Sequence, residues 1–338
     1  MMKTYKILFF NSMIIGTLIA ISAQNWLSIW MGLEINLMSF IPLLKTHNNK
    51  YPAESAMKYF ITQVLGSSLL LFVVTIFMTT KNPLMDDFSL TELLILSTAL
   101  LLKMGAAPFH FWFPEVLSGL NWNNALILLT WQKIAPILVL SHQIKSHTLF
   151  FSIIIITSSM ISGIQGLNQI CLRKILAYSS INHMSWMISA LLNSITIWIY
   201  YFLIYSFINM SIVLIMKNFN IFFLNQLSMI FTHSKKIKFI FMMNFLSLGG
   251  LPPFLGFLPK WLTINNMIDN KHYFLAILLI MFTLISLFFY LRITFSSFTL
   301  YTKKSLMIFF NKITFFQLMT NLFSLLGLIA CSFADSFM

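Results

Sequence analysis

Long apolar stretches, joined by short polar connections, run along almost the whole of this 338-residue chain. A helix needs about 20 consecutive apolar residues to cross the hydrocarbon core of a bilayer, and windows of roughly this length predict eleven spans here. With 59% hydrophobic and 9% charged residues, the chain has too little polar surface to coat a soluble globule. The sequence therefore predicts an all-α polytopic membrane protein that forms one membrane domain over residues 1–338.

Two of the predicted spans are too long to be straight. The approximate bounds of all the spans are Lys6–Ala23, Asn25–Leu44, Ser55–Thr80, Leu90–Leu120, Trp122–Gln143, Thr148–Leu167, Ile175–Asn193, Ile195–Met216, Phe239–Ile268, Tyr273–Phe295 and Met307–Ser332. Leu90–Leu120 and Phe239–Ile268 would each be roughly 45 Å long as straight helix, against about 30 Å of hydrocarbon. Pro108 in one, and Pro252 with Pro253 in the other, lack a backbone donor, so we expect both helices to break near mid-membrane.

The formal net charge of +13 follows the predicted topology. With the N-terminus on the inner side, only Lys81, Lys145 and Lys271 fall in outer loops, and three more lysines lie inside spans. The remaining fifteen Lys and Arg residues fall on the inner side. The positive-inside rule predicts such a distribution for eleven spans with the N-terminus inside and the C-terminus outside. The charge thus indicates membrane topology, and nucleic-acid binding is not expected.

The chain also contains an internal repeat. One segment recurs at a displacement of 145 residues and another, in the same order, at a displacement of 146. The first pairs Gly105, Pro108, Phe109, Pro114 and Glu115 with Gly250, Pro253, Phe254, Pro259 and Lys260; the second pairs Ile35, Asn36, Met38, Ser39 and Phe40 with Ile181, Asn182, Met184, Ser185 and Trp186. Copies five helices apart run in opposite directions across the membrane. We therefore expect an inverted repeat, approximately 25–143 and 172–295, as in many transporters.

Four ionisable residues lie inside predicted spans: Glu34, Lys103, Lys133 and Lys260. Each such group near the bilayer centre opposes insertion by about 2.5 to 3.5 kcal/mol. Glu34 and Lys133 are central in their spans, which argues against snorkelling to the surface, whereas Lys103 precedes the first break and Lys260 follows the second. A structural ion pair is the alternative for each, but charges kept at this depth indicate a pathway for ions.

The chemistry that this set allows is a proton relay. A lysine removed from water holds its proton less tightly, and a nearby carboxylate has the opposite effect. We therefore expect Glu34 to pair with Lys103, and Lys103 to pass its proton through water to Lys133 and onward to Lys260 when the pair weakens. Histidine is the side chain whose ordinary pKa lies nearest neutrality. His110 and His183 could each be a relay station or a hydrogen-bonded core histidine.

Four segments carry a resemblance to a known family. They are WMGLEIN at 30–36, LKMGAAPFHFWFPE at 102–115, TWQK at 130–133 and GGLPPFLGFLPK at 249–260. Together they resemble the NADH–ubiquinone oxidoreductase chain 2 family, the antiporter-like membrane subunits of mitochondrial respiratory complex I. The resemblance covers essentially the whole chain. The shorter metazoan members lack three leading helices, consistent with eleven spans, and the abundance of Phe, Met, Ile, Asn and Lys indicates an insect or other invertebrate source.

The resemblance implies an antiporter-like fold and a proton-translocating subunit of NADH:ubiquinone reductase. Glu34 and Lys103 resemble the family's regulatory pair, Lys133 its central relay and Lys260 its terminal lysine. The implied location is the mitochondrial inner membrane, with the N-terminus on the matrix side and the C-terminus on the intermembrane-space side. The implied partners are other complex I membrane subunits, including neighbouring antiporter-like subunits, and phospholipids such as cardiolipin.

No cofactor or metal is expected in this chain. Flavin, iron–sulfur clusters and ubiquinone belong to other subunits in the family, and the sequence has no Gly-x-Gly-x-x-Gly loop. Cys171 and Cys331 are too few for a cluster or a disulfide framework. Two other functions remain open: a free-standing cation/proton antiporter, which would show salt-gradient-dependent proton flux as an isolated chain, and a structural membrane subunit, in which neutralising Lys133 would leave pumping unchanged.

Overall fold

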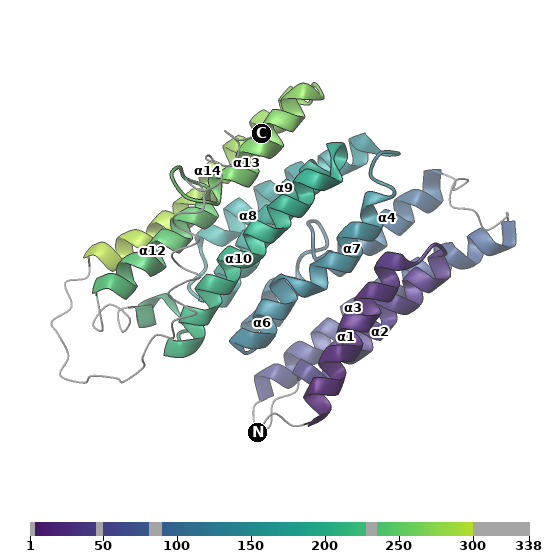
Figure 1. The fold of residues 1–338 in the computed structure, drawn as a ribbon, viewed down its shortest axis with the longest axis horizontal. Coiled ribbons are helices and arrows are strands. Elements are labelled where there is room, and N and C mark those ends of the chain that lie inside the picture. Colours follow the sequence, from purple (N-terminus) through teal and green to yellow (C-terminus); the bar gives the residue numbers. More distant parts are fainter. Residues whose placement is uncertain (1–3, 45–49, 81–89, 228–234, 300–338) are drawn as a thin grey trace, which may run out of the picture. The chain divides into compact units, whose positions relative to one another are not determined.

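The computed structural model describes residues 4–44, 50–80, 90–227 and 235–299, and Figure 1 shows that these residues form a set of helices. Outside the helices, the described residues contain one isolated β-bridge, between Cys171 and Phe223. Seven helical stretches of the described residues, with Trp122–Ser141 taken as one, are long and apolar enough to cross a membrane. The prediction of an all-α, multi-span membrane protein is confirmed. The last predicted span, Met307–Ser332, lies outside the described residues, so the number eleven stays a prediction.

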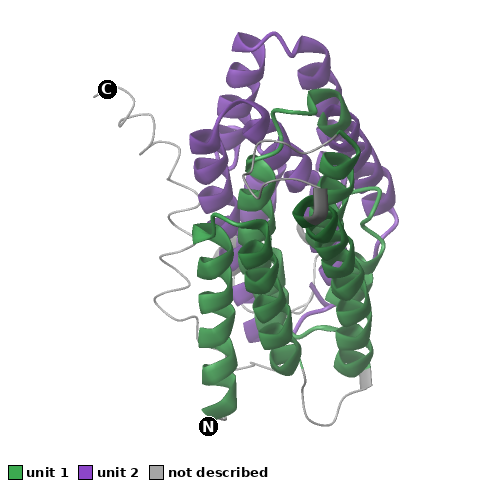
Figure 2. Cartoon of the chain, turned by 90° about the vertical axis from the view of Figure 1, so that its right-hand side faces the viewer, with its two compact units in different colours: residues 1–151 green, residues 152–338 purple. Residues whose placement is uncertain are grey.

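The chain divides into two compact units, residues 1–151 and 152–338 (Figure 2). The first unit contains α1 (Thr4–Ser22), α2 (Trp26–Leu44), α3 (Lys50–Thr80), α4 (Leu90–Met104), α5 (Trp112–Gly119), α6 (Trp122–Leu129) and α7 (Trp131–Ser141). The second contains α9 (Leu172–Asn193), α10 (Ile195–Phe219), η1 (Leu224–Gln226), α12 (Lys235–Gly249), α13 (Phe257–Asp269) and α14 (Tyr273–Thr299). Helix α8 (Thr148–Leu167) crosses the boundary between them.

Small residues bring α1 and α2 close together in the first unit. A Cβ added to Gly32 would lie 2.6 Å from the Ala20 nitrogen, and one added to Gly16 would lie 2.9 Å from the Asn36 nitrogen. Glycine at helix interfaces permits this backbone approach, which is common among membrane helices. Helix α2 also packs on α3, and both α1 and α2 contact α7.

Both predicted helix breaks are present, and each begins at a glycine. Gly105 after α4 has φ +74° and Gly250 after α12 has φ +76°, the left-handed conformation that glycine adopts readily. After α4, the amides of Gly105 and Ala106 donate to the carbonyls of Leu102 and Leu101. This is the Schellman arrangement that ends many helices.

The second break has the same arrangement. The amides of Gly250 and Leu251 donate to the carbonyls of Ser247 and Leu246, 145 residues along the chain from the bonds after α4. The Ala107–Pro108 and Pro252–Pro253 bonds, both cis, come after these bonds. We predicted the breaks from the prolines, but both helices have already ended at the glycine.

A further interruption divides the predicted span Trp122–Gln143 into α6 and α7. It lies at Thr130, where φ is −116° and ψ is −74°. Both the Thr130 amide and its Oγ1 donate to the Leu126 carbonyl, and the Lys133 amide bonds the Thr130 carbonyl three residues back. Side-chain bonding of this kind competes with the regular helix ladder. The sequence has neither glycine nor proline at this point, so it gave no signal of the interruption.

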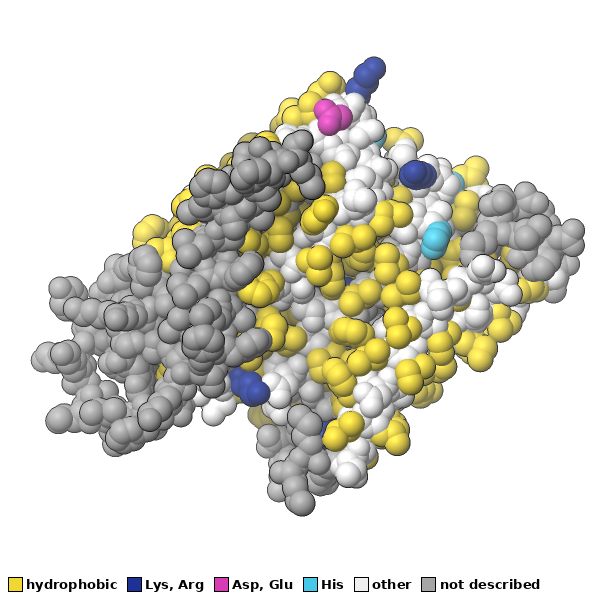
Figure 3. Space-filling model, viewed as in Figure 1, with side chains coloured by type: hydrophobic (Ala, Val, Ile, Leu, Met, Phe, Trp, Pro, Cys, Tyr) yellow, Lys and Arg dark blue, Asp and Glu magenta, His cyan; other side chains and the backbone are white. Residues whose placement is uncertain are grey.

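Side-chain exposure separates outer helices from inner ones. Helix α14 exposes large apolar side chains such as Phe274, Met281 and Phe288, as a lipid-facing helix does. Figure 3 shows hydrophobic side chains over much of the described surface on one face, with few charged ones among them. By contrast, α9 is buried along almost its whole length, including Ser180, Asn182 and His183. Helix α9 therefore places polar groups inside the second unit.

Candidate functional site

Lys103 lies in the last turn of α4, where the side chain is held between α3 and the end of its own helix. Its residue is only 6% exposed. Gly66 of α3 makes room for the side chain, because a Cβ there would lie 3.0 Å from Lys103 Cγ. Gln63 Nε2 donates to the Lys103 carbonyl at 3.2 Å. The Lys103 carbonyl lies in the last turn of α4, where carbonyls have no donor within the helix, and Gln63 supplies one.

Lys133 lies near the start of α7 and is 2% exposed. Its Nζ is 5.3 Å from the centroid of the Phe113 ring, within the range of a cation–π interaction. Phe113 belongs to α5, the helix that follows the first break. The burial of this lysine therefore depends on how the broken segment returns to the unit.

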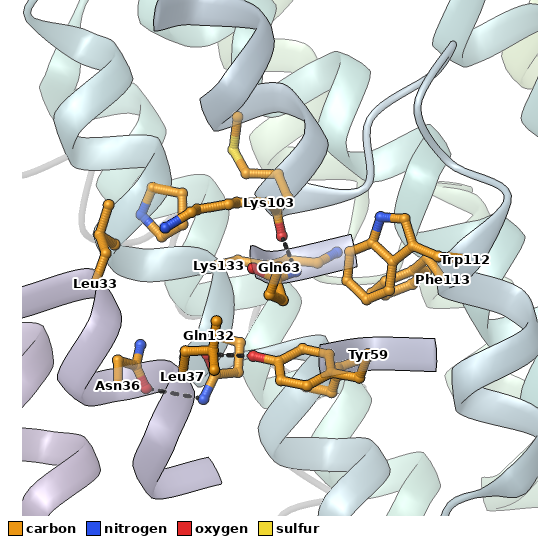
Figure 4. Close-up of a pocket in the computed structure, with 13 residues that line it drawn as sticks. Leu33, Asn36, Leu37, Tyr59, Gln63, Lys103, Trp112, Phe113, Gln132 and Lys133 are labelled. Carbon is orange, nitrogen blue, oxygen red and sulfur yellow. Dashed lines mark hydrogen bonds between the residues drawn. The ribbon is translucent and has the colours of Figure 1, made fainter. Parts of the chain in front are cut away.

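Lys103 and Lys133 line the same small cavity (Figure 4). The cavity has a volume of about 20 Å³, which is room for roughly one or two water molecules. Its polar lining, apart from the two lysines, consists of Asn36, Tyr59, Gln63 and Gln132. In Figure 4 the Lys103 chain extends toward Leu33 and the Lys133 chain toward Trp112 and Phe113. Water in the cavity would therefore have to connect the two amines.

The structure does not place Glu34 in this cavity. Glu34 lines a separate, open groove of about 400 Å³, together with Phe9 and Ser12 of α1 and several α2 residues. Among the described residues, no ion pair within 4.0 Å joins Glu34 to Lys103, whereas Lys58 pairs with Glu54 at 3.0 Å and with Glu115 at 2.8 Å. The structure therefore has no direct ion pair between Glu34 and Lys103, and their pairing through charge stays a prediction. Leu33 and Asn36 face the cavity, and Glu34 is turned about 100° away from Leu33 around α2.

Lys260 lies in the first turn of α13, in the second unit, and is 7% exposed. Its Nζ donates to the Gly249 carbonyl at 2.9 Å and lies 5.8 Å from the Trp186 ring centroid. The side chain crosses Gly250, where an added Cβ would be 2.7 Å from Lys260 Cδ. Lys260 thus folds back over the helix break that precedes it.

The two candidate histidines are both buried. His183 of α9 lies with its Nδ1 2.8 Å from the Tyr201 hydroxyl, and its ring centroid is 4.9 Å from that of Tyr205. His110, in the first broken segment, lies with its Nδ1 3.3 Å from the Pro108 carbonyl and its ring beside Phe111. His110 does not line the cavity of Lys103 and Lys133. Both histidines have the partners of a core histidine, which a relay station could also have.

Sequence reasoning missed several polar neighbours of these groups. Gln63, Gln132 and Tyr59 line the lysine cavity, and Tyr201 contacts His183. Gln132 directly precedes Lys133, and Gln63 is a buried amide in an apolar helix, so both carried a signal of intramembrane polarity. The tyrosines carried none, because tyrosine is enriched near the ends of membrane helices whether or not it has a function. Among the described residues, no group of three or more His, Cys, Asp or Glu side chains could hold a metal ion.

The chain is similar to known proteins along nearly its whole length. Residues 23–286 match a family model described as "NADH:quinone oxidoreductase/Mrp antiporter, TM". A protein of Anopheles gambiae named NADH-ubiquinone oxidoreductase chain 2 is 48% identical, with 98% of each chain covered. A protein of the same name from Scyliorhinus canicula is 39% identical over 88% of this chain and 86% of its own.

Solved structures share the fold. A chain of respiratory complex I from Thermus thermophilus superposes with a TM-score of 0.85 at 21% identity, over 97% of this chain and 79% of that one. A chain of the Mrp complex from Dietzia sp. gives a TM-score of 0.74 at 15% identity, over 83% of this chain and 58% of that one. The family model covers most of the chain, and the curated relatives exceed one-third identity over most of their length. This chain therefore belongs to the NADH:quinone oxidoreductase/Mrp antiporter membrane family, and within it to the relatives named NADH-ubiquinone oxidoreductase chain 2.

Proposed function

We propose that this chain is a proton-translocating membrane subunit of respiratory complex I, the enzyme that couples NADH oxidation and ubiquinone reduction to proton pumping. Relatives at 48% and 47% identity over nearly the whole chain bear the name of such a subunit. The family model and the fold of the complex I chain agree with it. The chain thereby contributes to an enzyme whose redox chemistry takes place in other subunits.

The observation that carries the mechanism is the shared cavity of Lys103 and Lys133. Two ammonium groups on one small cavity repel each other, and the low-dielectric surroundings strengthen that repulsion. Arrival of a proton at one lysine therefore favours release from the other, and a water between them can carry the proton. In this proposal Lys103 receives the proton first and Lys133 is the central relay.

Glu34, Lys260 and the histidines complete the proposed relay. Glu34 acts on Lys103 through its charge from the neighbouring groove, without direct contact. Lys260 is the terminal lysine, and the Gly249 carbonyl that accepts its hydrogen bond gives its ammonium a fixed position. His183, in contact with Tyr201, and His110 are candidate stations.

Substitution of Lys103 by Met tests the proposal. In the assembled complex, Lys103→Met should lower the number of protons translocated per NADH oxidised, because the amine that enters the cavity is gone. Lys145→Met is the matched control, since Lys145 is an exposed loop lysine outside the cavity and should leave pumping unchanged. Undiminished pumping by Lys103→Met in sealed vesicles would rule the relay out.

The wider setting follows from the same proposal. The chain would lie in the mitochondrial inner membrane, with its N-terminus in the matrix and its C-terminus in the intermembrane space, beside other complex I membrane subunits and phospholipids such as cardiolipin. It would hold no flavin, iron–sulfur cluster or ubiquinone, and bind no nucleic acid. The matched Schellman endings at Gly105 and Gly250 support a repeat over approximately 25–143 and 172–295, and we propose that its copies are inverted.

A cation/proton antiporter is the second candidate, because the family model and the fold also include Mrp antiporters. It predicts that the isolated chain, reconstituted in vesicles, moves protons when a sodium or potassium gradient is imposed. A complex I subunit should show no such flux unless assembled. The full-length similarity to proteins named NADH-ubiquinone oxidoreductase chain 2 favours the complex I function.

A further inference from the structure

A pair of side-chain amides joins the helix of Glu34 to the helix of Lys133. Gln132 Nε2 donates to Asn36 Oδ1 at 3.0 Å, and the Tyr59 hydroxyl donates to Gln132 Oε1 at 3.5 Å (Figure 4). Both ends of the Gln132 amide are therefore occupied, one by α2 and the other by α3. Asn36 itself is 3% exposed, so this link lies inside the first unit.

The turn that carries Lys133 is poorly fixed by its own helix. Before it, the ladder is interrupted at Thr130. After it, Pro136 has no N–H, so the Gln132 carbonyl lacks the donor that would normally lie four residues later. Backbone hydrogen bonds therefore hold this stretch less firmly than a continuous helix would, and side-chain contacts with neighbouring helices must fix its position.

We propose that Gln132 is a positioning residue for the relay: its bond to Asn36 fixes the Lys133 turn against α2, the helix that carries Glu34. The inference rests on the proposed function, because it assigns a role in the same proton relay. Asn36 follows Glu34 by two residues on α2, and Gln132 immediately precedes Lys133. A displacement of α2 at Glu34 is thus passed to Lys133 through one hydrogen bond.

The same pair also shapes the cavity. Asn36 and Gln132 both line it, beside Lys103 and Lys133. Because the two amides hold each other, the cavity has a fixed polar wall at which a water can be oriented. Loss of the pair would let the Lys133 turn shift and would disturb that wall, although the lysines themselves remain.

An exchange of the two amides provides the test. Gln132→Leu and Asn36→Leu each remove the bond, and the double variant Asn36→Gln with Gln132→Asn moves one methylene from one side chain to the other and keeps their summed length. The control is Asn124→Leu. Asn124 Nδ2 donates to the Leu43 carbonyl at 2.9 Å, so it also ties a neighbouring helix to α2, but it does not line the cavity.

Proton translocation is measured per assembled complex, together with NADH oxidation. Each Leu variant should lower translocation by roughly three- to tenfold, the range expected for one lost hydrogen bond. The two Leu substitutions together should cost no more than one alone, because they remove the same contact. The exchanged pair should restore at least about half of the rate, and Asn124→Leu should leave translocation unchanged.

Two results would overturn the positioning role: additive effects of the Leu variants, or an exchanged pair that assembles but translocates as poorly as the single variants. If the Leu variants fail to assemble, the exchanged pair alone decides: an exchanged pair that assembles but translocates at less than about half of the unsubstituted rate overturns the positioning role. Lys133→Met separates this inference from the proposed function. If Lys133→Met abolishes translocation and the amide variants behave additively, the relay stands and the positioning role fails; if Lys133→Met pumps normally, the relay itself fails.

Discussion

Lys103, Lys133 and Lys260 each have a specific neighbour that makes room for the side chain or contacts the ammonium group. Lys103 passes over Gly66, Lys133 lies beside Phe113, and Lys260 crosses Gly250 to reach the Gly249 carbonyl. A lysine that merely snorkelled would extend toward the membrane surface. These lysines are held at defined positions inside their units, as a group that must exchange protons with a particular neighbour requires.

Gly250 allows a direct test of the Lys260 position. Gly250→Ala should destabilise the chain by about 1–2 kcal/mol from its left-handed backbone alone. The new Cβ would also displace Lys260, because it would lie 2.7 Å from Cδ. Translocation should fall with the thermal stability of the assembled complex.

Gly249→Ala is the matched control for this substitution. It adds the same methyl group one residue earlier, where the nearest atom is 3.6 Å away, and should have little effect. Equal stability and equal translocation of the Gly249→Ala and Gly250→Ala complexes would contradict this account of how Lys260 is held.

The sequence identified the charged residues but not their contacts. Glu34, Lys103, Lys133 and Lys260 stand out because charge is rare in apolar spans. The direction in which Glu34 points depends on how α1 packs against α2. Gly16 and Gly32 make that helix contact, and neither glycine stands out in the sequence. The pairing of Glu34 with Lys103 was inferred from charge alone, and the structure shows no direct ion pair between the two side chains.

At the scale of helices, the breaks are the elements that position the site. The break after α4 ends that helix one residue beyond Lys103, and the break after α12 leaves the Gly249 carbonyl where Lys260 can reach it. Proline content and length were sufficient to predict both. The interruption at Thr130 depends on the bond from the Thr130 hydroxyl to the Leu126 carbonyl, which competes with the regular helix hydrogen bonds. No sequence pattern distinguishes a threonine that makes this bond from one that does not.

The close packing of α1 on α2 leads to a second prediction. Gly32→Ala would place a Cβ 2.6 Å from the Ala20 backbone nitrogen, which cannot move as a side chain can. The helices must separate, at an expected loss of about 1–3 kcal/mol. The measurement is the melting temperature and the amount of the assembled complex.

Gly163 of α8 provides the control for this packing test. A Cβ added there meets Ile285 at 3.4 Å, an ordinary contact, so Gly163→Ala should be tolerated. A Gly32→Ala complex as stable as the Gly163→Ala complex would show that α1 and α2 do not depend on this contact.

For the whole molecule, the long apolar stretches and the charge distribution were enough to predict the class. The matched helix endings, one in each unit, agree with the predicted repeat, whose copies 25–143 and 172–295 fall one in each unit. Whether the copies are inverted stays a prediction. The positive-inside distribution makes that prediction specific, because it assigns each loop to one side of the membrane.

Labelling of introduced cysteines tests the topology. With Cys171 and Cys331 both replaced by Ser to remove background, Lys145→Cys should react with an impermeant thiol reagent from the intermembrane-space side, and Lys217→Cys from the matrix side. Lys145 follows α7 and Lys217 lies at the end of α10, so an odd number of predicted crossings separates them. Labelling of both from the same side would contradict the predicted sidedness.

The central claim is that the cavity between α4 and α7 passes protons by means of its two lysines. The most direct measurement is the number of protons translocated per NADH oxidised by sealed vesicles containing the assembled Lys133→Met complex. Methionine fills the space of the lysine chain without its amine, and Lys145→Met serves as the reference. The account predicts that translocation through this subunit is lost while the reference pumps normally. Equal proton yields from the two variants would contradict it.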